Sequence, residues 1–421
     1  MSGPDSAPTT LRGPRPPIAI VRELSFLGLA VLVLAGTRPF EHGDIQRQAM
    51  SSRGSAFETV LYLSLTLLCI LTCLPRMKLS HLRRLYLWFG VLTIWCAMSL
   101  TWSLSINEAA ARFGQYLLVS CAVMGMVAVV PAQRLVHLFA LALGMVILVD
   151  LASLLLSENA VHRFNEPREA LVGAWKGLHI HKNYAGAVAG LAALVFLLRS
   201  FHLRRLSDLV MAGLSLLFLF GTGSRTSIFL TIPVPLALII LHMLFRFIGS
   251  SNARALSVLA AIIIAALSAV MLRLPGAVLD SNATLTGRVE LWNAMLAYAQ
   301  AHLLTGSGFG SFWRVGDSNP ILSLTWGWGT RTGQGHNGYL DILVTLGAPG
   351  LVLTLITFVV APMALLPGAI RAGGLALNTG IALLLFSLVH NLTESSLLVG
   401  NHPVFFALLL GVTLLARGEP R

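Results

Sequence analysis

Residues 134–156 read RLVHLFALALGMVILVDLASLLL, and this stretch decides the class of fold. Apart from Arg134 at its start, its only charged residue is Asp150. An apolar run of about 20 residues is long enough for an α-helix to cross the hydrocarbon core of a bilayer. Further apolar runs of this kind follow one another along the sequence, so we expect a chain that crosses a membrane many times.

The composition of the whole chain places it in the same class. Of its 421 residues, 56% are hydrophobic and only 11% are charged, whereas about 25% are charged in a typical soluble domain. We therefore predict an all-α polytopic membrane protein of about twelve transmembrane helices. The predicted helices cover residues 23–37, 56–74, 84–101, 113–131, 134–156, 184–199, 208–222, 226–247, 254–272, 339–365, 373–390 and 402–417.

One long polar segment interrupts the predicted helices. The chain divides into a tail at 1–20, helices one to nine within 21–272, a polar segment at 273–338 that we call the outer loop, helices ten to twelve within 339–417, and a tail at 418–421. The first tail has no short apolar stretch that ends in a cleavage site, so we expect no cleaved signal peptide. Loops as long as the outer loop are more often functional than not, and function is therefore sought there.

The net charge of +12 is explained by topology rather than by nucleic acid. The arginines are spread over many short connections, without the basic stripe and interleaved aromatic residues of a nucleic-acid-binding surface. Lys and Arg of short loops prefer the cytoplasmic side of a membrane. Most of these residues fall on one side when both termini are cytoplasmic, which places the outer loop on the opposite face.

The sequence shows no pattern for a metal or a cofactor. Cys69, Cys73, Cys96 and Cys121 lie inside apolar runs, without metal-ligand or disulfide spacing. Histidines and carboxylates also lack the spacing of metal ligands. The run GSGFG at 306–310 does not have the spacing of a dinucleotide-binding fingerprint. We therefore expect chemistry without a metal or cofactor.

The outer loop carries residues that are suited to chemistry. Residues 288–302 read as a short amphipathic helix in which Arg288 and Trp292 share a face. The loop ends in GHNGYLD at 335–341, which leads directly into a predicted transmembrane helix. His336 is thereby placed at the outer boundary between water and lipid, where its flanking glycines leave it accessible.

A histidine and several arginines on one side of a membrane favour transfer from a lipid diphosphate. An imidazole with a pKa near 6.5 can take a proton from a sugar hydroxyl at neutral pH. A guanidinium offers a planar set of donors that matches phosphate oxygens. Nucleotide sugars and ATP are not expected at the outer face, so the donor must carry its own activation. The residues predicted to lie on this side with His336 and Arg288 are Arg225, Arg331, His181 and Lys182.

Three other polar features have both a structural and a functional interpretation. The sequence GAVAG at 186–190 is explained by close packing of helices. Asp150, inside a predicted membrane helix, either pairs with a polar neighbour or has a functional role. His390, Asn391 and Glu394 lie at the outer end of a helix, where they are either ordinary polar residues or supports for a site.

Several segments, taken in order, resemble the bacterial family of O-antigen ligases and O-antigen polymerases, which are integral membrane glycosyltransferases. The likeness spans roughly residues 100–400 and rests on the ordered set rather than on a single motif. Its segments are HKNYAG at 181–186, GSRT at 223–226, TGR at 286–288 with Trp292, GSGFGSFW at 306–313, and HNGYLD at 336–341 followed by Leu346 and Gly347.

This resemblance implies a helical bundle of the bacterial inner membrane with a large periplasmic loop. The implied substrate is a glycan on undecaprenyl diphosphate, held in the lipid bilayer. The implied catalytic residues are His336, which acts at the acceptor hydroxyl, and Arg288. The diphosphate is then bound by Arg225, Arg288, Lys182 and Arg331. The residues expected to contact the acceptor or to support the site are His181, Asn337, Asp341, Trp292, His390 and Glu394.

Four functions remain open at this point. The pair Phe312 and Trp313, with His390, Asn391 and Glu394, resembles the exopolysaccharide polymerase branch, so we favour a polymerase of lipid-linked repeat units. A ligase that transfers the glycan to lipid A core differs only in its acceptor. A transporter or flippase would be expected to show repeated halves, and a scaffold for export would need no catalytic arginine. Expected partners are a chain-length regulator and export proteins, and nucleic acid is not expected.

Overall fold

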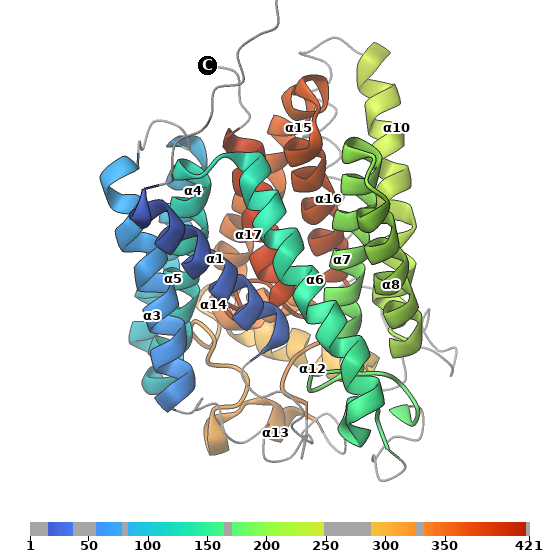
Figure 1. Cartoon of the computed structure of the whole chain (residues 1–421). Coiled ribbons are helices and arrows are strands. Elements are labelled where there is room, and N and C mark those ends of the chain that lie inside the picture. Colours follow the sequence, from blue (N-terminus) through green and yellow to red (C-terminus); the bar gives the residue numbers. More distant parts are fainter. Residues whose placement is uncertain are drawn as a thin grey trace, which may run out of the picture.

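The computed structural model describes residues 16–36, 56–77, 83–163, 171–247, 288–325 and 332–417. Within these residues the chain is helical, and its only extended pairing is an isolated bridge between Val161 and Trp175. The all-α class is therefore confirmed. The main helices are α1 (Pro17–Ala35), α3 (Ala56–Cys73), α4 (Arg83–Ser99), α5 (Ile106–Val129), α6 (Ala132–Leu156), α7 (Lys182–Leu203), α8 (Leu206–Thr222), α9 (Arg225–Thr231), α10 (Pro233–Phe247), α12 (Arg288–Ala301), α13 (Ile321–Leu324), α14 (Gly338–Leu355), α15 (Ala361–Ala372), α16 (Leu375–His390) and α17 (Pro403–Arg417) (Figure 1).

The lengths and composition of these helices confirm a polytopic membrane protein. Among the described residues, seven helical segments are long and apolar enough to cross a bilayer, and four shorter apolar helices accompany them. The predicted helix at 254–272 lies outside the described residues. The total of about twelve membrane helices therefore stays a prediction. The helix predicted at 288–302 is confirmed as α12, which ends at Ala301.

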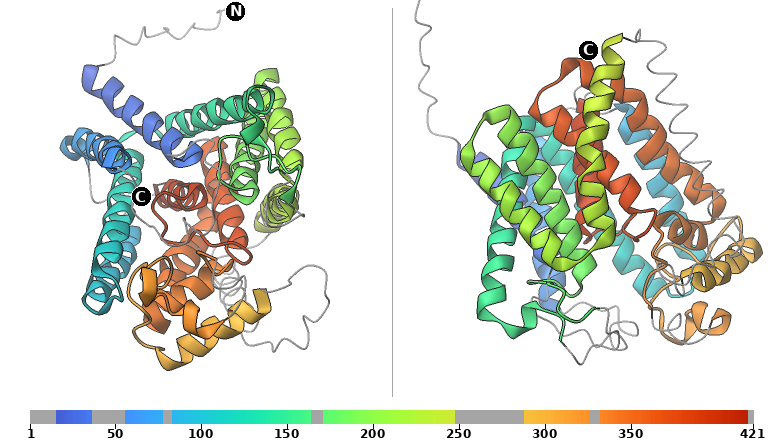
Figure 2. Two further views of the ribbon diagram at one scale, coloured as in Figure 1. Left: turned by 90° about the horizontal axis from the view of Figure 1, so that it is seen from below. Right: turned by 90° about the vertical axis from the view of Figure 1, so that its right-hand side faces the viewer.

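Helix α17 forms the centre of the bundle. Its residues from Pro403 to Ala416 are all buried, and α5, α7, α15 and α16 pack around it. In the left view of Figure 2 it is the red helix beside the C mark, surrounded by the others. A helix that is apolar on every side is stable when other helices or lipid cover all of its faces.

The two ends of the bundle carry different features. At one end, which we call the terminal end, α1 begins and α17 ends. Here Arg134 binds Glu23 at 2.7 Å and Arg417 donates a hydrogen bond to the carbonyl of Val130. The opposite end, which we call the loop end, carries α12, α13 and the loops after α6 and α16 (Figure 1). The face of the membrane that each end occupies stays a prediction.

Helix α14 is broken at Gly347, and the outer loop fills the break. Gly347 has a φ of 69°, which an α-helix does not allow and which glycine adopts without steric cost. Segments of the outer loop replace the missing helical hydrogen bonds. The amide of Ser307 donates to the carbonyl of Val344 at 2.9 Å, and the amide of Ala348 donates to the carbonyl of Leu303 at 2.7 Å. The loop is therefore inserted into a membrane-spanning segment.

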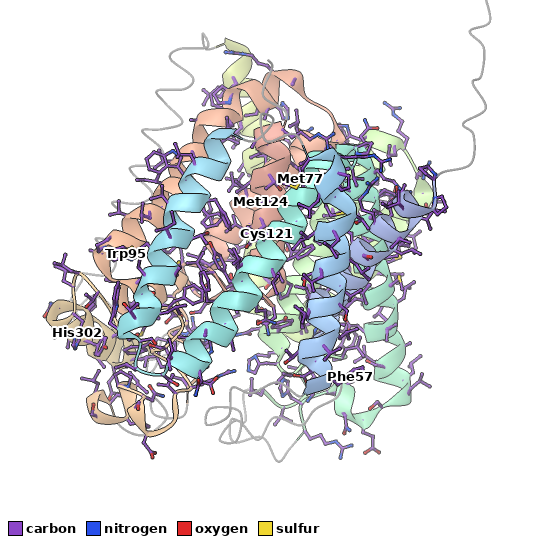
Figure 3. The ribbon with its side chains drawn as sticks, turned by 90° about the vertical axis from the view of Figure 1, so that its left-hand side faces the viewer. Phe57, Met77, Trp95, Cys121, Met124 and His302 are labelled. Carbon is purple, nitrogen blue, oxygen red and sulfur yellow. The ribbon has the colours of Figure 1, made fainter. Side chains whose placement is uncertain are left out.

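The sides of the bundle present apolar side chains to their surroundings. Phe57, Phe201 and Phe229 are each more than two-thirds exposed. A large exposed apolar surface is unfavourable in water and suits contact with lipid. In Figure 3, Phe57 and His302 lie toward the loop end and Met77 lies toward the terminal end, with apolar side chains between them.

Candidate active site

The backbone on the N-terminal side of His336 is held from two directions. The amide of Gly335 donates to the carboxylate of Asp341 at 3.1 Å, and its carbonyl accepts from the indole N–H of Trp292 at 2.7 Å. His336 itself has a φ of 50°, in the left-handed region that residues with a side chain rarely adopt. Such backbone strain persists only where the surroundings impose it. The fold thus fixes the direction in which this imidazole leaves the chain.

The residues after His336 are bound to the loop that joins α16 to α17. Asn337 caps α14, because its side-chain oxygen accepts from two amides of the first turn. The amide of Asn337 donates to the hydroxyl of Ser395 at 3.1 Å, and the amide of Gly338 donates to the carbonyl of Glu394 at 3.0 Å. These bonds place the Glu394 side chain beside the imidazole.

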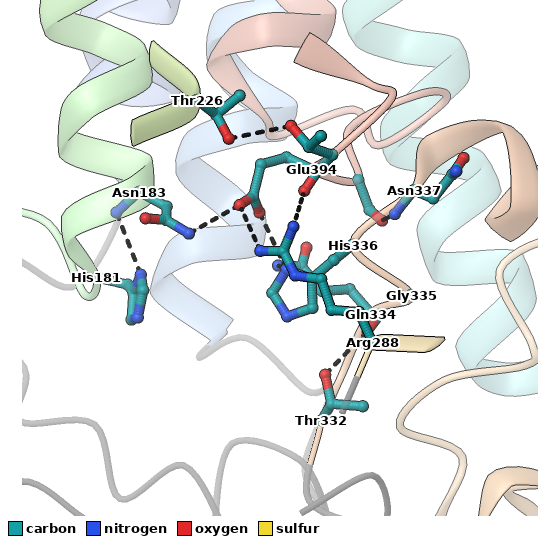
Figure 4. Close-up of polar contacts among 12 residues, drawn as sticks. His181, Asn183, Thr226, Arg288, Thr332, Gln334, Gly335, His336, Asn337 and Glu394 are labelled. Carbon is teal, nitrogen blue, oxygen red and sulfur yellow. Dashed lines mark hydrogen bonds and ion pairs between the residues drawn. The ribbon is translucent and has the colours of Figure 1, made fainter. Parts of the chain in front are cut away.

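Glu394 lies at the centre of a network of polar contacts (Figure 4). One carboxylate oxygen is 3.1 Å from Nδ1 of His336. The other accepts from Nδ2 of Asn183 at 2.8 Å and lies 3.4 Å from the guanidinium of Arg288. The Glu394 side chain is only 7% exposed. A buried carboxylate is stable as an anion only with partners of this kind.

Glu394 is ionised and sets the tautomer of His336. Burial alone would raise the pKa of Glu394, but the hydrogen bond and charge of His336, together with Arg288, lower the pKa to about 2. An ionised carboxylate can only accept, so Nδ1 of His336 carries the proton that it donates. In the neutral imidazole, Nε2 is then the nitrogen that is free to take up a proton.

Arg288 approaches this pair from the first position of α12. Its guanidinium donates to the carbonyl of Thr393 at 2.9 Å and faces Glu394, and its side chain remains 23% exposed. A guanidinium has five N–H donors. The contacts to Thr393 and Glu394 therefore leave donors of Arg288 for an anion on the open side.

The turn between α8 and α9 brings further cations to the same place. The hydroxyl of Thr226 lies 3.0 Å from the hydroxyl of Thr393. Its neighbour Arg225 is exposed and forms no ion pair with another described residue. Lys182, at the start of α7, is close to this turn, since a Cβ placed on Gly223 would lie 3.9 Å from its Nζ. We call Arg225, Lys182 and Arg288 the cationic group.

The start of α7 reaches this turn because Gly186 has no side chain. A Cβ at this position would lie 2.4 Å from Cβ of Ser224, which is closer than packed atoms can approach. Four residues on, a Cβ on Gly190 would lie 3.1 Å from the ring of Phe386. The packing interpretation of the GAVAG segment is confirmed.

Asp150 positions the loop that leads into α7. It is fully buried, and its carboxylate accepts from the amide of Leu178 at 2.9 Å and lies 3.1 Å from Nε2 of His179. Of its two interpretations, pairing with polar neighbours is therefore the one that the structure supports. The pair holds the segment before His181 against α6.

Other residues expected at the site act differently or lie elsewhere. Asp341 accepts from the indole N–H of Trp313 at 2.8 Å as well as from Gly335, and so supports the loop that bears His336. The ring of His390 packs on Phe386 and is buried, with no hydrogen-bond partner for its nitrogens among the described residues. Arg331 lies outside the described residues.

Three residues of the network were missed in the sequence. Asn183 and Thr226 lie within the resembling segments HKNYAG and GSRT, and Thr393 directly precedes Glu394, but nothing in the sequence joins the three to one network. Their contacts join distant segments: Asn183 is 211 positions from Glu394, and Thr226 is 167 positions from Thr393. Adjacency along the sequence does not show such contacts.

The described side chains offer a proton acceptor and several cations. No group of three or more His, Cys, Asp and Glu side chains within the described part of the chain is arranged to hold a metal ion. His336 presents Nε2, and Arg288 of the cationic group supplies positive charge beside it. Together they suit proton removal from one substrate group and binding of an anion on another.

These features define a polytopic, all-helical membrane protein with a polar site at one end of its bundle. Residues 210–355 match the family described as O-antigen ligase. The matched part, which is less than half of the chain, includes Arg225, Arg288 and His336 and is similar to this family. The match supports glycan transfer of this general type, with a lipid-linked glycan as substrate in a membrane. No curated protein matches the chain.

Proposed function

We propose that this protein transfers a glycan from undecaprenyl diphosphate to a sugar hydroxyl at the periplasmic face of the bacterial inner membrane. The observation that carries the proposal is the contact of His336 Nδ1 with the buried carboxylate of Glu394, which Arg288 of the cationic group also contacts. This arrangement leaves a base, Nε2, next to groups that bind phosphate. Both are needed for transfer from a lipid diphosphate.

The proposed step breaks one bond to the anomeric carbon and forms another. The acceptor hydroxyl oxygen bonds to the anomeric carbon of the donor sugar, and its proton passes to Nε2 of His336. The bond from that carbon to the diphosphate oxygen breaks, and undecaprenyl diphosphate leaves with the electron pair. Arg288, Arg225 and Lys182 stabilise the negative charge that develops on the leaving group.

The acceptor distinguishes two versions of this function. Polymerisation of lipid-linked repeat units is favoured by Phe312 and Trp313 and by the segment around Glu394. In that case the acceptor is a second lipid-linked unit, and the proposed partners are a chain-length regulator and export proteins. The matched family, described as O-antigen ligase, favours the alternative in which the acceptor is lipid A core. A deletion strain with single repeat units identifies a polymerase, and one with long unattached polymer identifies a ligase.

The first test replaces the proposed base. We expect His336→Ala in purified protein to lower transfer of a lipid-linked oligosaccharide by about 100-fold or more, because general base catalysis contributes 10²–10⁴-fold. His302→Ala is the matched control, since this exposed histidine follows α12 and packs on Tyr298. Undiminished transfer by His336→Ala would remove His336 from the proposed role.

The second comparison separates this function from transport and from a scaffold. Arg288→Ala should abolish transfer in the same assay, with Arg163→Ala, at an exposed arginine that binds Glu158, as the control. A scaffold predicts unchanged polymer length for Arg288→Ala. A transporter predicts that purified wild-type protein moves the lipid-linked glycan across vesicles without forming a new glycosidic bond.

A further inference from the structure

His181 is held in one tautomer by the helix that it caps. It precedes α7, and its Nδ1 accepts a hydrogen bond from the backbone amide of Asn183 at 3.2 Å. A ring nitrogen that accepts cannot carry a proton, so the proton of the neutral ring is on Nε2. His181 therefore presents an N–H donor at the edge of the ring that faces away from the helix.

Asn183 connects this ring to that of His336. Its backbone amide fixes the tautomer of His181, while its side chain donates to the same carboxylate that accepts from Nδ1 of His336. In Figure 4 the Nδ1 edges of both rings face this shared support, and the opposite edges point the same way, away from the helices. The site thus presents two imidazoles of opposite character, a proton acceptor on His336 and an N–H donor on His181.

The surroundings of His181 keep its ring neutral. Burial is the main cause that lowers the pKa of His181 to about 3, and the neighbouring His162 lowers it further. Among the other facing groups, His336 and Lys182 act in the same direction, and Glu394 opposes them. The ring of His181 meets that of His162 edge-on at 5.5 Å. His181 is therefore a neutral donor near neutral pH.

The backbone amides at the start of α7 do not provide an anion site by themselves. The amide of Lys182 donates to Nε2 of His162, and that of Asn183 donates to His181. The amide of Tyr184 donates to the carbonyl of His181. The donors that remain beside this helix end are side chains, namely Nε2–H of His181 and the ammonium of Lys182.

Building on the proposed function, we propose that His181 donates Nε2–H to an oxygen of the diphosphate leaving group. His181 acts there as a neutral donor beside Lys182 and Arg225. Asn183 and Glu394 lie between it and the base, His336. One ring then removes the proton of the acceptor while the other stabilises the departing phosphate oxygen. No bond to His181 forms or breaks in this step.

Two substitutions separate this role from helix capping. His181→Asn keeps a good N-cap, because the side-chain oxygen of asparagine can accept from the amide of Asn183, but it removes the donor at the position of Nε2. His181→Gln places an amide N–H near that position and gives a poorer cap. We expect His181→Asn to retain the thermal stability of the wild type and to lower kcat about 10- to 100-fold, the effect of losing one hydrogen bond to a charged group.

The kinetic pattern tests whether His181 acts on the leaving group as its bond breaks. Because charge grows on the diphosphate only as the bond breaks, His181→Asn should change kcat more than the KM of the lipid-linked donor. His181→Gln should recover part of the lost kcat despite lower stability. The proposal is overturned if His181→Asn has wild-type kcat, or if His181→Gln is no better than His181→Asn. The broader function fails separately, when His336→Ala transfers as well as the wild type.

Discussion

The side chain of Glu394 has two tasks, which it performs with its two oxygens. One orients His336, and the other joins Arg288 of α12 to Asn183 of α7. Because its pKa is lowered to about 2 in the folded protein, its ionised form stabilises the fold above the unfolded pKa of about 4.3. That contribution is lost as the pH falls toward 2. Loss of activity nearer to neutral pH therefore does not come from protonation of Glu394.

We expect Glu394→Gln to lower transfer more than any change in folding explains. The amide keeps the size of the side chain but removes the charge, so Nδ1 of His336 loses its anionic acceptor and Arg288 loses its partner. A similar loss of an orienting carboxylate costs about 10⁴-fold in kcat in the serine proteases, and we expect a drop of about 100-fold or more here. Transfer rate and thermal unfolding are measured together, with the exposed Glu158→Gln as control. Activity equal to that of the control would contradict this account of Glu394.

At the scale of elements, the position of the cationic group depends on how α7 meets the turn between α8 and α9. The contact is close enough that only glycine fits at position 186. The same helix begins with Lys182, which supplies one cation. Its next residue, Asn183, donates a side-chain hydrogen bond to Glu394. A small displacement of α7 therefore moves parts of the site that lie on different segments.

Gly186→Ala should destabilise the protein and weaken donor binding. The added methyl group overlaps Ser224 and forces α7 away from the turn, at a cost of about 1–3 kcal/mol. Gly213→Ala is the matched control, because a Cβ on this glycine of α8 meets no atom within 4 Å. Thermal unfolding in detergent and the KM of the lipid-linked donor are the measurements. Equal unfolding temperatures for the two variants would show that a methyl group fits at Gly186 without displacing α7.

The elements themselves were largely predictable, whereas their interruptions were not. Apolar runs such as 134–156 predict helices because lipid leaves the backbone no other partner for its polar groups. The break at Gly347 was missed, since its hydrogen bonds come from the outer loop, some 40 positions earlier in the sequence. The chemistry of their side chains was enough to predict His336 and Arg288 as site residues. The central position of Glu394 could not be predicted, because it depends on contacts between distant segments. Its partners are 58 and 106 positions away.

For the whole molecule, the division into a loop end and a terminal end makes a prediction about orientation. Positive residues such as Arg134, Arg205 and Arg417 gather at the terminal end, which is expected on the cytoplasmic side. The site at the loop end is then periplasmic, where the glycan donor is expected. This orientation is needed for the proposed function.

Single cysteines report this orientation directly. With the four native cysteines replaced by alanine, His302→Cys at the loop end should react with a membrane-impermeant maleimide in intact spheroplasts. Arg205→Cys, exposed at the terminal end, should react only after the membrane is opened. The reverse pattern would place the site in the cytoplasm and would refute the proposed reaction.

The insertion of the outer loop into the break at Gly347 limits how this protein can be recombined with its relatives. A hybrid that receives residues 288–338 alone keeps its own Val344 carbonyl and Ala348 amide. The hydrogen-bond partners of these two groups then come from a foreign segment whose backbone is not positioned for them. Unmatched backbone groups inside a bilayer cost several kcal/mol each. The smallest unit that can be grafted intact therefore runs from α12 through the end of α14, so that acceptor preference and this part of the membrane domain have to be inherited together.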